Sequence, residues 1–334
     1  MKTNSIKAWL LASRPKTLTG AAAPVVVGGT MAFVSFLLPV VQKSIDMYGE
    51  LRLDDHFMMA KVISYGVPFV LCLLFAFMMQ IDANFINDYF DFKKGTDRED
   101  RLGPERACAQ GWITPRAMKW GIGITTVLSV AVGMLIMMWH MQWELLVVGM
   151  LCVLFCFLYT TRLSYLGWGD VLVLVFFGIV PVVFTFYVMT GGICTVPLIL
   201  ASIAMGLATD NLLMVNNYRD RNQDVLSGKR TIVVRIISAC KDKKGSAQGR
   251  IIGERLCRRL YLCIGIVATV LGIVAADLYS GTAAKIPFLL IYLILHVKAY
   301  MTMKSLDGSA LNKVLGVTAR NIFLFGVLLA ASVF

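Results

Sequence analysis

The sequence predicts an all-α polytopic membrane protein with about nine transmembrane helices. Apolar residues make up 58% of its 334 residues, and the mean hydropathy is +0.73. Several stretches exceed the roughly 20 apolar residues that a helix needs to cross a bilayer. Lys and Arg residues gather in alternate connecting segments, as in multi-pass proteins. We therefore expect a single integral-membrane domain over residues 1–334.

The N-terminal segment, residues 1–17, is expected to lie at the membrane interface. Trp9, Leu10 and Leu11 stand beside basic residues, an arrangement typical of an interfacial helix. The following apolar stretch is longer than the core of a signal peptide and lacks an obvious cleavage site, so we expect it to stay as the first span. The nine expected spans cover residues 18–41, 62–86, 118–139, 143–161, 168–190, 195–215, 259–277, 284–303 and 313–334.

The distribution of basic residues predicts the orientation. If the N-terminus is cytoplasmic, the cytoplasmic segments contain 26 Lys and Arg residues and the opposite face contains 4. Positively charged loops are retained in the cytoplasm, so we expect a plasma (inner) membrane protein with its N-terminus inside and its C-terminus outside. The net charge of +12 does not indicate nucleic acid binding, because the basic residues lie in short loops without a recognisable nucleic-acid motif.

Two acidic motifs carry the chemistry. The first is Asn87-Asp88-Tyr89-Phe90-Asp91, and the second runs from Asn216 to Asp224. Each follows a long apolar segment and opens a basic cytoplasmic loop, expected over residues 87–117 and 216–258. Helical spacing places Gln80, Asn84, Asn87 and Asp91 on one stripe with Asp88 beside it, and Asn216, Asn217, Asp220 and Asp224 follow the same spacing.

These oxygen-rich motifs suit magnesium, which typically binds one or two carboxylates together with waters and phosphate oxygens. A diphosphate held between the motifs would be neutralised by neighbouring bases, and its departure would break an allylic C–O bond more easily. Either motif alone is also compatible with a solvated helix end that pairs with Lys and Arg. The adjoining bases are Lys93, Lys94, Arg98, Arg101, Arg106, Lys229 and Arg230.

With these motifs the chain resembles the UbiA superfamily of intramembrane prenyltransferases, and within it the branch that prenylates 1,4-dihydroxy-2-naphthoate in menaquinone synthesis. The residues that carry the resemblance are Arg14 to Leu18, Asn87 to Asp97, Arg101 to Pro104, Tyr159-Thr160 and Asn216 to Asp220. It covers roughly residues 8–235, and the later helices match only as apolar spans. It implies a nine-helix bundle around a central cavity, capped on the cytoplasmic side, with a lateral opening for a lipid tail.

The resemblance also implies roles for individual residues. Asn87, Asp91, Asp220 and Asp224 would ligate Mg²⁺ with the diphosphate, and the catalytic set would be Asp88, Asp91, Asp220 and Asp224. Support would come from Asn84, Asp97, Tyr159 and Asn216, and the diphosphate contacts would be Lys94, Arg106, Arg162, Lys229 and Arg230.

The sequence departs from the family pattern at two places. Some relatives have a third Asp where this chain has Gly95, with Asp97 as the next acid. Relatives also pair a Tyr with a nearby Lys after the fourth span, whereas here Tyr159 is followed by Arg162. Arg162 either supplies charge to the diphosphate or anchors the loop at the lipid headgroups.

The implied reaction transfers a polyprenyl group from polyprenyl diphosphate to 1,4-dihydroxy-2-naphthoate with decarboxylation, giving demethylmenaquinone. Arg14 and Lys16 are the expected contacts of the acidic acceptor, although an Arg-Pro pair also serves as a plain helix start. The alternatives are 4-hydroxybenzoate or another lipid-quinone precursor as acceptor, and a cation-coupled transporter. A transporter would place its acids nearer mid-membrane, on broken helices.

Overall fold

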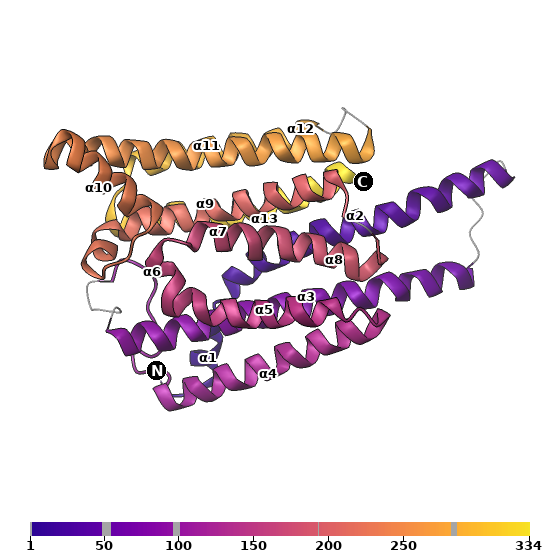
Figure 1. Cartoon of the computed structure of the whole chain (residues 1–334), viewed down its shortest axis with the longest axis horizontal. Helices are drawn as coiled ribbons and strands as arrows, with labels where there is room; N and C mark the ends of the chain where they lie inside the picture. The colour runs from indigo at the N-terminus through magenta and orange to yellow at the C-terminus, as the bar shows by residue number, and fades with distance from the viewer. Residues whose placement is uncertain (1, 49–54, 96–100, 193, 282–285) are drawn as a thin grey trace.

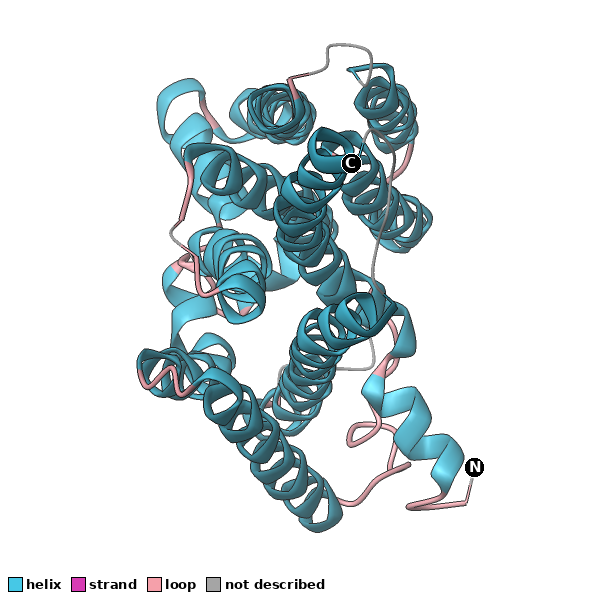
Figure 2. Cartoon of the chain, turned by 90° about the vertical axis from the view of Figure 1, so that its right-hand side faces the viewer, coloured by secondary structure: helices cyan, strands magenta, loops and turns pink. Residues whose placement is uncertain are grey.

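The computed structural model describes residues 2–48, 55–95, 101–192, 194–281 and 286–334. Within these ranges the chain forms helices and connecting loops only (Figures 1 and 2). Nine helical segments among them are long and apolar enough to span a membrane. The prediction of an all-α bundle with about nine spans is therefore confirmed.

The spans follow one another along the chain, some as single helices and some as pairs broken by a π-turn. The elements are α1 (Ile6–Ser13), α2 (Pro15–Tyr48), α3 (Asp55–Lys94), α4 (Pro115–His140), α5 (Glu144–Leu158), η1 (Tyr159–Leu163), α6 (Ser164–Leu166), α7 (Gly169–Leu174), η2 (Val175–Ile179), α8 (Val180–Thr190), α9 (Val196–Leu226), α10 (Ile232–Lys244), α11 (Ser246–Ser280), α12 (Ile286–Ser305), η4 (Gly308–Leu311) and α13 (Asn312–Val333).

Helix α9 lies at the centre of the bundle and packs against α2, α7, η2, α8, α11 and α13. In its most apolar window 67% of the residues are buried, compared with 11% for the span that contains α3. Small residues allow this close packing. A Cβ added to Gly178 of η2 would lie 2.5 Å from the carbonyl oxygen of Ser202 and 2.7 Å from Gly206 Cα, both on α9. The second acidic motif is therefore built on the most constrained helix.

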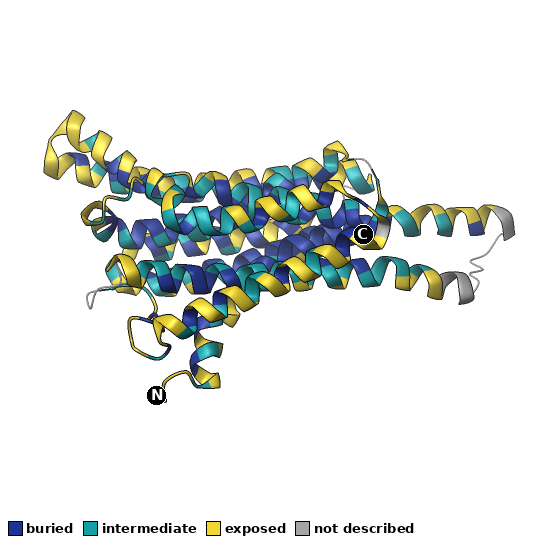
Figure 3. Ribbon diagram, turned by 60° about the horizontal axis from the view of Figure 1, so that its bottom comes forward, coloured by how far each residue is buried: buried dark blue, intermediate teal, exposed yellow. Residues whose placement is uncertain are grey.

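Of the two segments that we expected to be loops, 216–258 is largely helical, whereas the described part of 87–117 is helical over residues 87–94 and 115–117 and forms a loop over residues 101–114. Helix α3 continues through the first motif to Lys94, and α9 continues through the second to Leu226. Charged residues outside the apolar spans are compatible with a helix, and the glycines that end these helices, Gly95 and Gly228, lie beyond the motifs. Helix α10 and the first turns of α11 then form an exposed hairpin (Figure 3). Both motifs are thus held on rigid helices.

Helix α1 crosses the end of the bundle beside α3 and α4. It buries Ala8 and Ala12 and leaves Leu10 and Leu11 exposed. The Trp9 ring packs edge-on against Phe85 of α3, with centroids 5.3 Å apart. The arrangement fits the expected interfacial helix, whose contact with lipid remains a prediction.

Candidate active site

The two acidic motifs meet at the same end of the bundle, where α3 and α9 end (Figure 1). Their carboxylates influence one another, since Asp224 interacts electrostatically with Asp91. The phenol of Tyr159 also lies within electrostatic reach of both. The chain between α3 and α4, residues 101–114, runs across this end; we call it the 101–114 loop.

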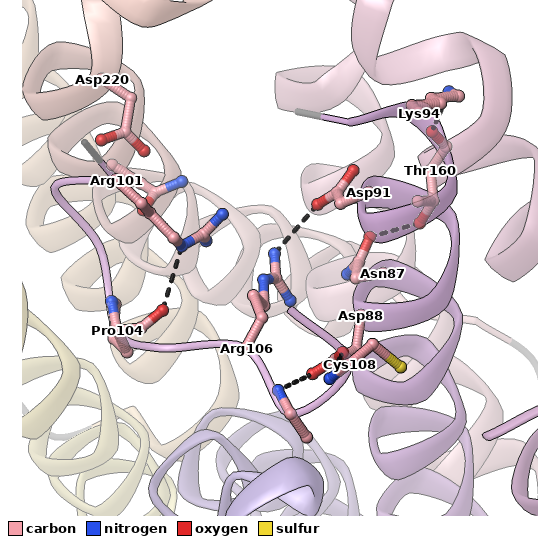
Figure 4. Close-up of polar contacts among 12 residues, drawn as sticks. Asn87, Asp88, Asp91, Lys94, Arg101, Pro104, Arg106, Cys108, Thr160 and Asp220 are labelled. Atoms are coloured by element: carbon pink, nitrogen blue, oxygen red, sulfur yellow. Dashed lines mark hydrogen bonds and ion pairs between the residues drawn. The ribbon is translucent and has the colours of Figure 1, made fainter. Parts of the chain in front are cut away.

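Asp91 of the first motif is ion-paired with the 101–114 loop. Nη2 of Arg106 donates to Oδ2 of Asp91 at 3.1 Å, and Arg106 is buried. In Figure 4 the side chains of Arg101 and Arg106 lie between Asp91 on one side and Asp220 on the other. The expected diphosphate contact Arg106 is therefore beside a predicted metal ligand.

Asp88 lies on the same helix but has a different role. Its two carboxylate oxygens accept the backbone N–H groups of Ala107 and Cys108, each at 2.8 Å. The side chain is 1% exposed. The loop thus binds both oxygens, which favours a supporting role for Asp88 over the catalytic role that the resemblance implies. Asp88 fixes the segment that carries Arg106.

Asn87 of the first motif and Lys94, at the end of α3, contact η1, a π-turn of the kind often found at functional sites. The hydroxyl of Thr160 donates to the side-chain carbonyl of Asn87. Lys94 Nζ donates to the carbonyl oxygens of Thr160 and Thr161 at 3.2 and 2.9 Å. It also lies 4.0 Å from the centroid of the Tyr165 ring. Lys94 thus stands at the rim of the site with its charge available to an anion.

The second motif contains a bidentate ion pair. Arg219 donates from Nε to Asp220 Oδ1 at 2.7 Å and from Nη2 to Asp220 Oδ2 at 2.6 Å. The same guanidinium donates to the side-chain oxygens of Asn216 at 2.6 Å and Asn312 at 2.7 Å. Arg219 is 2% exposed. Asn216 and Asp220 thus bind the same guanidinium, and the supporting role of Asn216 stays a prediction.

Asp224, one helical turn further on, is flanked by a base. Lys229 Nζ lies 3.8 Å from Asp224 Oδ1, and the carboxylate is 8% exposed. Lys229 also faces the Tyr165 ring, at 5.3 Å from its centroid. Lys94 and Lys229 thus approach the same ring from the two motifs.

Arg14 and Lys16 are separated by the structure. Arg14 ends α1 with φ of 50° and lines a cavity of about 230 Å³ together with Asp88, Pro104 and Trp112. Burial, followed by the charge of Arg106, lowers the pKa of Arg14 to about 9. Lys16 is exposed. Of the two expected acceptor contacts, only Arg14 faces a cavity.

The Asn84 amide binds the junction of α1 and α2 and not the carboxylates of the first motif. Its Nδ2 donates to the carbonyl oxygen of Ser13 at 2.9 Å and to Thr17 Oγ1 at 3.0 Å. These residues flank Arg14, so Asn84 holds the junction of α1 and α2. Its expected role beside the metal is not what the hydrogen bonds show.

The other expected site residues lie further out. Arg162 and the Arg230 side chain are exposed, while the Arg230 backbone N–H donates to the carbonyl oxygen of Tyr165 at 3.0 Å. Gly167 permits this contact, because its φ is 80° and a Cβ there would lie 2.3 Å from the Arg230 carbonyl oxygen. Asp97 lies outside the described residues.

The donor set fits a metal that is bound together with a diphosphate. Asp91, Asp220, Asp224 and the Asn87 carbonyl supply hard oxygen ligands, which Mg²⁺ prefers. Among the described residues no three His, Cys, Asp or Glu side chains form a ready-made metal cluster. The carboxylates are instead held by Arg106, Arg219 and Lys229. The phosphate oxygens would therefore complete the coordination.

Sequence reasoning missed two residues of this site. No role is predicted for Arg219 from the sequence, although its position directly before Asp220 could have indicated one. Asn312 lies at the start of α13, in a region with no motif, and only its contacts with Arg219 and the Leu102 carbonyl, the latter at 2.8 Å, bring it to the site.

Comparisons with known proteins place this geometry in a family. The chain matches the UbiA prenyltransferase family over residues 57–327. It is 32% identical over 246 residues to the 1,4-dihydroxy-2-naphthoate octaprenyltransferase of Haemophilus influenzae, with 71% of each chain covered. It is 30% identical over 337 residues to the Escherichia coli protein of the same name, with 98% of this chain and 95% of that one covered.

The similarity therefore extends well beyond residue 235, where the resemblance expected from the motifs ends. The fold also matches a solved chain from a study of digeranylgeranylglyceryl phosphate synthase, with a TM-score of 0.57, 16% identity and 98% of both chains covered. The family match, the fold and the two facing acidic motifs agree. This chain belongs to the UbiA prenyltransferase family.

Proposed function

We propose that this protein transfers a polyprenyl group from polyprenyl diphosphate to 1,4-dihydroxy-2-naphthoate, with loss of carbon dioxide, to give the reduced (quinol) form of demethylmenaquinone. The observation that carries the proposal is the meeting of the two acidic motifs under the 101–114 loop, with Arg106 on Asp91 and Arg219 on Asp220. Paired carboxylates and bases at one place suit a metal diphosphate. The names of the relatives support the choice of acceptor.

The diphosphate head would lie between α3 and α9. Asp91, Asp220, Asp224 and the Asn87 carbonyl would hold Mg²⁺, which when bound neutralises charge on the diphosphate and makes it a better leaving group. Arg106, Lys94 and Lys229 would contact the phosphate oxygens directly. Arg106 is the strongest of these candidates because it is buried and already aimed at the site.

The acceptor would enter the cavity beside Arg14. A guanidinium suits a carboxylate, since it can donate two parallel hydrogen bonds. Arg14 is held there by the Asn84 contacts on either side of it. The naphthoate carboxylate would thus face Arg14, and its ring would point toward the first motif.

The chain's residues then orient the two substrates. As the allylic C–O bond breaks, its electron pair leaves with the diphosphate, where Arg106 and Lys94 stabilise the added charge. The electron-rich ring carbon that bears the carboxylate forms the new C–C bond. Cleavage of the bond to the carboxylate then returns an electron pair to the ring and releases carbon dioxide, which restores aromaticity.

The 26-to-4 distribution of Lys and Arg supports a cytoplasmic active site. We therefore propose a plasma (inner) membrane location with the N-terminus and both motifs on the cytoplasmic side and the C-terminus on the other. The two ends of the chain lie toward opposite ends of the bundle (Figure 1), as this orientation requires.

The metal and diphosphate residues do not distinguish one aromatic acceptor from another, so 4-hydroxybenzoate remains the second candidate. A cation-coupled transporter is disfavoured, because the acids lie at helix ends and the chain belongs to a prenyltransferase family.

A transfer assay tests the proposal. Membranes containing the protein receive radiolabelled polyprenyl diphosphate with either acceptor, with and without Mg²⁺. We expect Mg²⁺-dependent product from the naphthoate, abolished in Asp91→Asn and retained in Asp242→Asn, which removes an exposed carboxylate on α10. Product only from 4-hydroxybenzoate would overturn the choice of acceptor, and no product with either acceptor would overturn the proposed activity.

A further inference from the structure

A continuous chain of contacts joins the two acidic motifs through Asn312 of α13. Asp220 is bound by Arg219, and Arg219 Nη1 donates to Asn312 Oδ1 at 2.7 Å. On its other side Asn312 Nδ2 donates to the carbonyl oxygen of Leu102 at 2.8 Å. The amide of Asn312 is therefore used in both directions, as acceptor from the second motif and as donor to the 101–114 loop.

The loop carries the connection onward to the first motif. Arg101 Nε donates to the carbonyl oxygen of Pro104 at 3.0 Å, which closes a tight turn directly after Leu102. Arg106 follows this turn and binds Asp91. Asp88 fixes the two residues after Arg106 by their backbone N–H groups. The loop is thus tied to α3 through residues 106–108 and, through Leu102 and Asn312, to α9 and α13.

The packing around Arg219 shows that this end of the loop is closely fitted. A Cβ added to Gly103 would lie 2.9 Å from Arg219 Nη2, closer than real contacts allow. Arg219 has little room to move aside, because its nitrogens already donate to Asp220, Asn216 and Asn312. The loop therefore rests directly on the guanidinium that holds the second motif.

We infer that Asn312 is a positioning residue of the reaction, which holds the 101–114 loop against the second motif and so sets the spacing of the two halves of the diphosphate site. The inference rests on the proposed function, in which the diphosphate bridges Asp91 and Asp220. A bridging ligand requires both motifs at a fixed separation. Without Asn312, the hydrogen-bonded link between Arg219 and the backbone of the 101–114 loop is lost, and only the packing of Gly103 against Arg219 and the loop's other contacts remain.

Three variants of the full-length protein test this inference. Asn312→Ala removes both hydrogen bonds, whereas Asn312→Asp keeps an oxygen for Arg219 and loses the donor to Leu102. Gly103→Ala places a Cβ of the loop too close to Arg219 Nη2 and so disturbs the contact between the loop and Arg219. The matched control is Asn321→Ala, which removes a buried amide from the same helix away from the loop.

The first readout is amide hydrogen exchange in the substrate-free protein, which does not depend on activity. We expect exchange in the peptide covering residues 101–106 to become about tenfold or more faster in all three variants, with α13 and the control unchanged. Unchanged exchange in this peptide, or exchange that rises equally throughout the bundle, would overturn the inference.

The second readout is the prenyl transfer rate. We expect the KM for the prenyl diphosphate and the Mg²⁺ concentration for half-maximal rate to rise, with rate restored at saturating donor and metal. A fall in kcat alone would indicate merely structural damage and refute a positioning role. Since the exchange experiment needs no substrate, it tests the contact network even where the wild-type protein prenylates neither acceptor.

Discussion

The carboxylate of Asp220 is bound through both of its oxygens by Arg219, the residue that precedes it in the chain, at 2.7 and 2.6 Å. Adjacent residues on a helix normally point in different directions, so this pairing requires the Arg219 side chain to fold back along α9. Burial and the further contacts with Asn216 and Asn312 hold it there. Asp220 is thereby oriented before any ligand binds.

Replacing Arg219 by Lys should lower kcat/KM for the prenyl donor by about tenfold to a hundredfold, since hydrogen bonds to charged groups contribute about 1.5–3 kcal/mol and an ammonium does not reproduce the planar pair. Steady-state transfer assays at varied donor concentration measure this. Arg221→Lys is the matched control, because Arg221 is also buried but pairs with Glu254 and Asp307 away from the motif. Equal losses in both variants would contradict a specific role for Arg219.

Replacing Asp88 by Asn should release the 101–114 loop. An amide offers one oxygen where two backbone N–H groups now bind, so one of them would face the NH₂ group, at a cost of about 1–3 kcal/mol. Cys108 is buried at 3% exposure and should then react faster with a maleimide, as peptide mass spectrometry can measure. Asp91→Asn should abolish transfer while leaving the alkylation rate of Cys108 near the wild-type value. A wild-type alkylation rate in Asp88→Asn would argue against the anchoring role.

Mg²⁺ and diphosphate should bind together more strongly than either binds alone. In the free protein the carboxylates of Asp91, Asp220 and Asp224 are neutralised by Arg106, Arg219 and Lys229, so a metal alone meets little net negative charge. In the proposed complex, diphosphate would bind Arg106 and Lys229 and so leave the carboxylates free to bind the metal. Thermal unfolding should show Tm rising by roughly 5 °C or more with both ligands and far less with either one. An equal rise with Mg²⁺ alone would show a preformed metal site.

The sequence predicted the spans and both motifs well, because hydropathy and charge act locally along a helix. It failed where contacts are distant in sequence. Gln80, Asn84, Asn87 and Asp91 share the expected stripe, yet the structure divides them: Gln80 donates to Asn84 at 3.5 Å, Asn84 binds the junction of α1 and α2, and only Asp91 pairs with the loop. Helical spacing gives a face but does not say which neighbour packs against each turn.

Asn312 shows the same limit more clearly. Its partners, Arg219 and the carbonyl of Leu102, lie on a different helix and a different loop, and no pattern in a single sequence connects them. The expected loops 87–117 and 216–258 began at the two motifs, whereas α3 continues to Lys94 and α9 to Leu226, because charge marks the end of the apolar span and not the end of the helix.

Arg14 should lower the stability of the substrate-free protein and strengthen binding of the acceptor. Burial, followed by the charge of Arg106, lowers the pKa of Arg14 to about 9. The charged guanidinium therefore destabilises the folded protein at pH values below about 9, and this destabilisation decreases as the pH rises above that value. We therefore expect Arg14→Met to raise the Tm of the substrate-free protein at pH 7. The same change removes the proposed partner of the acceptor carboxylate, so the KM for the naphthoate should rise about tenfold or more.

An anion bound beside Arg14 offsets the burial cost, because it favours the charged guanidinium. Adding a naphthoate analogue should consequently raise the Tm of the wild-type protein and leave that of Arg14→Met nearly unchanged. Lys16→Met is the matched control: Lys16 is exposed, so its loss should change neither the Tm nor the acceptor KM. If Arg14→Met instead raises the KM values of donor and acceptor equally, Arg14 serves the fold of the α1–α2 junction and the acceptor binds elsewhere.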